Sequence, residues 1–204
     1  MSQPLSRDEA WDLLTEWVDS PSLRRHCLAV EAAMRAAARR EGADEELWGV
    51  VGLLHDMDYE RHPDPASGHP RMAMAELERR GQPPEMIRAI ASHADYLDVP
   101  RESPLEHTLY AVDELSGFVV ACAMVRPEGI RGMTPKSVKK KLKQPSFAAA
   151  VNREDVRRGA EELGVDFDEH VRFVIAALEE RANELGLVPG AGDQPVEASA
   201  RPAD

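Results

Sequence analysis

The chain has 204 residues, 43 % of them hydrophobic, which is enough for one domain with its own core. It carries 37 acidic residues against 25 basic ones, a formal net charge of −12, which argues against general binding to nucleic acid polymers or anionic membranes. A small anionic substrate remains compatible with this charge if cations gather locally.

Helix signals begin close to the N-terminus. Ser6 opens the pattern of a capping box and predicts the start of a first helix. The pair Ser20-Pro21 predicts a second helix, which we expect to run to about residue 41 because Gly42 follows as a natural stop. Asp44 predicts the cap of a third, apolar helix that ends in the sequence "LLHD".

The rest of the chain continues as helices separated by loops. The segment "DYERHPDPASGHP", residues 58–70, is rich in Pro, Gly and Ser and predicts a loop. Further helices are expected over about residues 71–80, 83–97, 103–125, 134–143, 152–164 and 166–186. No alternating pattern predicts a strand, so the fold class expected is an all-α helical bundle. We expect one domain over residues 1–188, and a disordered tail over 189–204 because that stretch is polar, small and proline-rich.

Cysteine content and hydropathy bear on the cellular environment. Cys27 and Cys122 are too few for a disulfide framework and suit a reducing compartment. The N-terminus has no apolar stretch typical of a signal peptide, and the longest apolar run, residues 117–125, is too short to cross a bilayer. These features predict a soluble, cytoplasmic protein with no membrane partner.

Four histidines and two carboxylates stand at or beside predicted helices, mostly among apolar residues. Such groups are costly to bury unless a partner compensates them. If the helices bring them together, they form a ligand set suited to iron, manganese, cobalt, nickel or zinc. Two ions would fit, with Asp56 as the natural bridge beside His55. The six expected metal ligands are His26, His55, Asp56, His69, His93 and Asp113.

The order His, His-Asp, His, His, Asp resembles the signature of the HD superfamily of metal-dependent phosphohydrolases, in its dinuclear branch. The resemblance covers about residues 20–125. One departure is that Met57-Asp58 follows the His-Asp pair where the family usually has an apolar residue and glycine. The resemblance implies an all-helical fold, one or two divalent transition metal ions with iron or manganese first, and hydrolysis of a phosphate ester.

The function expected is therefore metal-dependent hydrolysis of a small phosphorylated substrate, for instance a nucleotide, by a metal-activated water. Two alternatives stay open. A minority of dinuclear members of this superfamily are iron oxygenases, and their ligands are nearly the same. A metal-containing binding module without turnover is the third interpretation.

Cations near the reacting phosphate would stabilise the charge that develops on it. The candidates are Arg25 beside His26, Arg61 in the loop, and the run "KSVKKKLK", in which Lys136, Lys139 and Lys143 are spaced to share one helix face. A solvated helix surface explains the lysines equally well. The catalytic side chains expected are Asp56, Arg61, Lys136 and Lys139.

The remaining polar residues near the motif have secondary or structural interpretations. Asp58 and Glu60 could order a ligating imidazole or water, or could simply solvate the loop. We assign no ligand role to His62, His107 and His170, and we expect the last two at exposed positions near helix starts. The three tryptophans fit apolar helix faces and are expected in the core: Trp11, Trp17 and Trp48.

Overall fold

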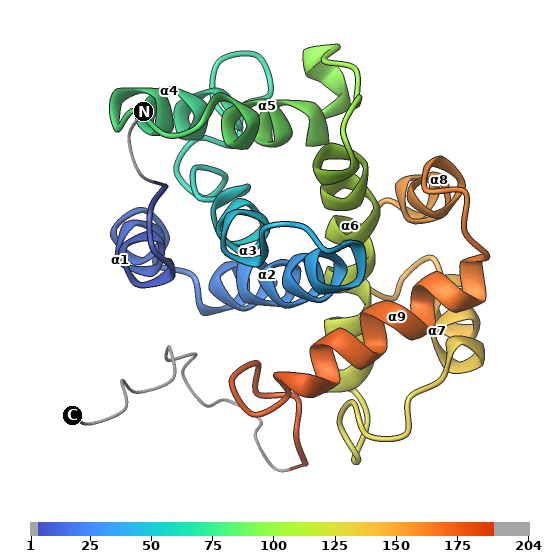
Figure 1. Cartoon of the computed structure of the whole chain (residues 1–204). Coiled ribbons are helices and arrows are strands. Elements are labelled where there is room, and N and C mark those ends of the chain that lie inside the picture. The colour runs from blue at the N-terminus through green and yellow to red at the C-terminus, as the bar shows by residue number, and fades with distance from the viewer. Residues whose placement is uncertain (1–3, 190–204) are drawn as a thin grey trace.

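The computed structural model describes residues 4–189 of the chain, and the regular secondary structure of that part is all helical, with no β-strand (Figure 1). The expected all-α fold class is confirmed. The helices are α1 (Arg7–Trp17), α2 (Pro21–Glu41), α3 (Glu45–Leu54), α4 (Arg71–Arg79), α5 (Pro84–His93), α6 (Pro104–Met124), α7 (Pro135–Leu142), α8 (Arg153–Glu162) and α9 (Phe167–Glu180), with a short 3₁₀ helix at Asp95–Leu97.

The caps predicted from sequence form as expected at the start of the chain. Ser6 accepts a hydrogen bond from the backbone amide of Glu9, and the Glu9 carboxylate accepts from the amide of Ser6, which completes the capping box. At the C-terminal end of α2, Gly42 adopts the left-handed conformation at φ 66°, which a residue with a side chain rarely adopts.

Two predicted helices end earlier than expected. The helix predicted over 83–97 stops at His93, because Ala94 adopts an extended conformation and only three residues of 3₁₀ helix follow. The helix predicted to reach Gly186 stops at Glu180. Beyond it the chain turns, and the carbonyl of Leu187 accepts a hydrogen bond from the amide of Ile130 in the loop after α6.

The apolar helix α3 is packed on several sides, which explains its composition. Every residue from Trp48 to Leu54 is buried, and α3 contacts α1, α2, α5 and α6. Gly52 allows the closest approach to α2, because a Cβ atom there would lie 2.9 Å from Met34 Cγ and 3.0 Å from the backbone of Glu31. This close packing places Gly52 against the middle of α2, and His55, one turn further along α3, beside His26.

The long helix α6 connects the two sides of the molecule. It packs against α2 and α5 on one side and against α8 on the other, and Figure 1 shows α1 and α7–α9 at opposite ends of this arrangement. Trp48 is buried, and Trp11 and Trp17 pack partly buried against the core, as expected. No helix among residues 4–189 is long and apolar enough to span a membrane. The predicted tail lies outside the described residues except for Pro189.

Candidate metal centre

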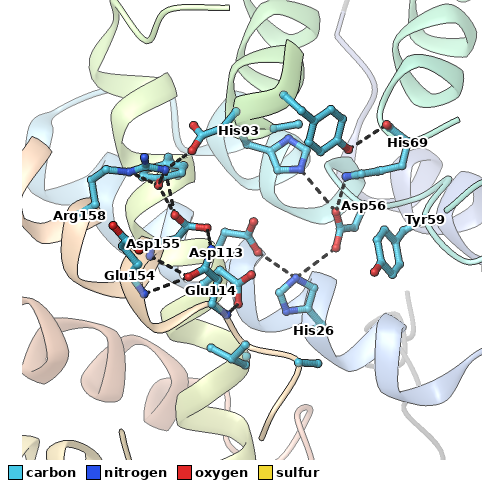
Figure 2. Close-up of a pocket in the computed structure, with 18 residues that line it drawn as sticks. His26, Asp56, Tyr59, His69, His93, Asp113, Glu114, Glu154, Asp155 and Arg158 are labelled. Carbon is cyan, nitrogen blue, oxygen red and sulfur yellow. Dashed lines mark hydrogen bonds and ion pairs between the residues drawn. The ribbon is translucent and has the colours of Figure 1, made fainter. Parts of the chain in front are cut away.

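All six predicted ligands meet at one place, although they come from positions far apart in the sequence (Figure 2). The elements that bring them together are the second turn of α2 for His26, the end of α3 for His55 and Asp56, the loop before α4 for His69, the last residue of α5 for His93, and the middle of α6 for Asp113. Four helices therefore converge on a single cluster.

Asp56 occupies the middle of the cluster. Its carboxylate oxygens lie 3.4 Å from His26 Nε2, 3.4 Å from His69 Nε2 and 3.6 Å from His93 Nε2. It belongs to two groups of three side chains, each able to hold a metal ion, one with His26 and His55 and the other with His69 and His93. Asp56 is thus placed where a bridging carboxylate would be.

The second carboxylate, Asp113, lies on the side of His26 and His55. Its Oδ1 is 3.0 Å from His26 Nε2 and 3.3 Å from His55 Nε2, and the two Nε2 atoms are 3.3 Å from each other. The carboxylate of Asp113, on the mostly apolar helix α6, therefore has its partners in the imidazoles of α2 and α3.

Helix ends orient two of the imidazoles. The last carbonyls of a helix have no backbone donor within the helix. His55 Nδ1 donates a hydrogen bond to the Gly52 carbonyl at 2.8 Å, and His93 Nδ1 donates one to the Ile90 carbonyl at 2.6 Å. In both cases the carbonyl belongs to the residue three positions earlier in the sequence. Because Nδ1 must donate in both bonds, Nε2 of each ring keeps its lone pair and points at the cluster, which is the tautomer a metal ligand needs.

A buried carboxylate orients the third imidazole. Asp58 is fully buried, and its Oδ1 accepts from His69 Nδ1 at 2.8 Å while its Oδ2 accepts from the backbone amide of Ala73 in α4 at 2.8 Å. Asp58 therefore fills the ligand-ordering role considered from sequence. Glu60 does not, because its carboxylate accepts from the amides of Asp19 and Ser20 and so fixes the loop to the start of α2.

The donor set fits metal ions. Two ligand atoms each about 2.1 Å from one ion lie about 3.0 Å apart at right angles and about 3.4 Å apart in a tetrahedron. The separations between donor atoms here run from 3.0 to 3.6 Å. Imidazole lone pairs directed at one another and at carboxylates need a cation between them, and the mixture of nitrogen and oxygen donors suits a divalent transition metal.

The carboxylates perturb the protonation of the metal-free cluster. Burial would lower the pKa of His26, but its hydrogen bonds and attraction to Asp113 and Asp56 outweigh this and raise it to about 10. Burial opposes ionisation of Asp113 as well, yet its electrostatic interactions and hydrogen bonds with the imidazoles of His55 and His26 hold its pKa below the ordinary value. Because a metal ligand must be deprotonated, metal binding to His26 releases this proton and is favoured at higher pH.

A cavity of about 720 Å³ opens directly from the cluster. Five of the six predicted ligands line it, and His55 lies behind them, fully buried. Glu114, next to Asp113, also faces the cavity, and burial together with the charge of Asp113 raises its pKa to about 7. The other lining side chains that bear on recognition are Tyr59, Asp95, Tyr96, Tyr110, Asn152, Glu154, Asp155 and Arg158.

The cations expected at the site lie elsewhere. Arg61 donates to the Glu16 carbonyl at the end of α1. Lys139 pairs with Asp168 on α9 at 2.6 Å, and Lys136 is exposed on α7, a helix that packs against α9 and α6 through Val138 and Leu142. None of the three lines the cavity. The structure therefore does not bring the side chains of Arg61, Lys136 and Lys139 to the ligand cluster.

Arg25 also points away from the cavity, although it is the chain neighbour of His26. Its guanidinium lies 3.8 Å from the sulfur of Met124 at the end of α6. Adjacent residues on a helix face different directions, so closeness in sequence did not bring this cation to the cluster.

The three histidines given no ligand role lie outside the cluster, but one of them differs from expectation. His170 is only 4 % exposed, and its Nε2 donates to the Ala111 carbonyl at 2.9 Å, so it is a core residue that joins α9 to α6. His107 is partly exposed and pairs with Glu162, and His62 lies in the loop near Trp17.

Comparison with known proteins supports the assignment of the cluster. No match was found among curated proteins or among solved structures. Residues 23–117 match the family model described as HD domain. The matched segment contains all six clustered ligands and ends four residues after Asp113. The convergent histidines and aspartates therefore all lie in the part of the chain that is similar to HD domains.

Proposed function

We propose that the protein is a metal-dependent phosphohydrolase that acts on a small phosphate monoester at a centre of two divalent ions. HD domains are generally metal-dependent phosphohydrolases, and this chain carries the complete ligand set. The observation that carries the proposal is the position of Asp56, which is shared by two groups of three possible ligands. A single structural site would not need a second pair of histidines.

The residues of the chain divide the work as follows. One ion would be held by His26, His55 and Asp113, and the other by His69 and His93. Asp56 would bind both ions. Bound ions supply Lewis acidity and a hydroxide nucleophile at neutral pH. The cavity, which opens on the ligand residues, gives a substrate access to them.

The charge balance of the centre supports a phosphate substrate. Four neutral imidazoles and two carboxylates compensate only half of the positive charge of two divalent ions. The remaining positive charge matches a phosphate dianion. This matters because the cations predicted from sequence do not reach the cavity, so attraction of the phosphate falls to the metal centre itself.

The test is a panel of phosphate monoesters and nucleotides, assayed for phosphate release with anaerobically purified protein loaded in turn with manganese, iron, cobalt, nickel or zinc. We expect release from at least one ester, and its loss in His55→Ala, in which metal content also falls. A His107→Ala variant is the matched control, because that histidine lies outside the cluster.

Two results would redirect the proposal. Oxygen consumption with an organic substrate, without phosphate release, would identify an oxygenase. Ligand binding without turnover that is unchanged in Asp56→Ala would identify a binding module.

A further inference from the structure

Carboxylates dominate the walls of the cavity beyond the metal-ligating residues. Glu114 comes from α6, Glu154 and Asp155 come from the first turn of α8, and Asp95 comes from the 3₁₀ helix. Figure 2 shows Glu114, Glu154 and Asp155 gathered on one side of Asp113. A substrate that reaches the metal centre therefore lies against an acidic wall.

Arg158 is the single Lys or Arg among the described residues that line this cavity, and its guanidinium is already paired with carboxylates of the protein. Its guanidinium bonds to Asp155 at 2.9 Å, to the carboxylate of Asp95 and to the hydroxyl of Tyr110. Glu114 and Glu154 have no ion pair within residues 4–189, and Glu114 accepts only the backbone amide of Asn152, at 3.2 Å. The side chains of Glu114 and Glu154 therefore remain available to a ligand.

Aromatic rings form a second, independent feature of the same cavity. Tyr59 and Tyr96 are 50 % and 47 % exposed, an uncommon state for large rings, and both lie next to His69. Rings attract cations through their faces. The ring of Tyr110 already shows this, because Arg101 and Arg158 stack on it at 3.7 and 5.0 Å.

We infer that the cavity selects a phosphate monoester whose alcohol part carries an ammonium group. The inference rests on the proposed function, in which the phosphate faces the metal ions. The ammonium group would then lie against the carboxylates of Glu114 and Glu154 or a tyrosine ring. A nucleoside polyphosphate is disfavoured, because its additional phosphates would face the same carboxylates.

Three esters of similar length test the inference: 2-aminoethyl phosphate, propyl phosphate and 2-carboxyethyl phosphate. Their binding to the metal-loaded protein is measured by calorimetry, which needs no turnover. We expect the aminoethyl ester to bind about tenfold tighter than the propyl ester, about 1.4 kcal/mol, and the carboxyethyl ester to bind most weakly. Phosphate release from the same esters gives kcat/KM as a second readout.

Variants assign the preference to the acidic wall. Glu154→Gln should reduce the preference for the aminoethyl ester by about two- to fivefold, the range for a solvent-exposed charge pair. Glu114→Gln is the second variant, on a different helix. Glu161→Gln is the matched control, because Glu161 is an exposed glutamate of the same helix α8 that does not line the cavity. It should leave the preference unchanged.

The outcomes separate this inference from the proposed function. Equal affinities, tightest binding of the carboxyethyl ester, or no binding of any ester overturns the inference. Release of phosphate from all three with equal kcat/KM overturns it too but leaves phosphohydrolysis standing. The expected binding order without phosphate release supports the charge preference of the cavity and refutes phosphohydrolysis.

Discussion

The hydrogen bonds of Asp58 predict a specific failure in the variant Asp58→Asn. The carboxylate accepts two hydrogen bonds, from His69 Nδ1 and from the Ala73 amide, and both are 2.8 Å long in a fully buried position. An asparagine of the same shape has one carbonyl oxygen, so one of the two donors must face an NH₂ group. If the Ala73 amide keeps the oxygen, the imidazole must move its proton to Nε2.

The expected magnitude follows from this conflict. A proton on His69 Nε2 would point toward Asp56 and occupy the direction of the metal bond, since these atoms are 3.4 Å apart. Loss of such an orienting partner weakens metal binding by about ten- to a hundredfold, which corresponds to about 1.4–2.7 kcal/mol. If His69 keeps the oxygen instead, the buried amide of Ala73 loses its acceptor, at a cost of about 1–3 kcal/mol in folding stability.

Two measurements distinguish these results. Competition with a fluorescent chelator gives the metal affinity, and urea unfolding in the presence of chelator gives the stability. Asp64→Asn is the control, because Asp64 is an exposed loop residue that caps its own turn through Ser67 and Ala66. Unchanged metal affinity together with unchanged stability in Asp58→Asn would refute the reasoning.

Four further variants test other parts of the structure. Asp56→Ala should remove nearly all bound metal, whereas His69→Ala should remove one of two ions; elemental analysis checks this, and equal losses would contradict the shared role of Asp56. Lys139→Ala should leave KM for a phosphorylated substrate unchanged and destabilise the fold by at most about 1 kcal/mol, because its exposed pair with Asp168 lies outside the cavity. Burial lowers the pKa of His170 below 6.5, so its contribution to stability is complete above that pH and declines as the pH falls through it. Between about pH 7.5 and pH 5, the urea midpoint of His170→Gln should therefore change less than that of the unmodified protein. An equal change in the two proteins would oppose this assignment.

Local signals in the sequence predicted most of the fold. Serine, aspartate and proline at helix starts, and Gly42 at a helix end, act through hydrogen bonds and backbone conformation within a few residues, so they can be recognised without the tertiary structure. The error at the end of the last predicted helix arises where the chain after it makes a long-range contact. The carbonyl of Leu187 bonds to Ile130, which lies far away in the sequence.

The ligand cluster was predictable for a different reason. Buried histidines and carboxylates on apolar helices need a common partner, so their residue types and order carried the information. The acidic wall gave no comparable signal. Glu154, Asp155 and Arg158 form an ordinary charged turn of a surface helix, and only the packing of α8 against α6 places them in the cavity. The lysine run misled because its density in an acidic chain says nothing about which face α7 buries.

The two sides of the cavity belong to different parts of the chain. The metal-holding side lies within residues 23–117. Other lining residues come from α8 and its N-cap, beyond that segment: Asn152, Glu154, Asp155 and Arg158. The part of substrate choice that depends on Glu154 can therefore change during evolution without changes among the metal-ligating residues. Exchange of residues 150–158 between homologous proteins would change which substrate binds in the cavity and would leave the metal-ligating residues unchanged.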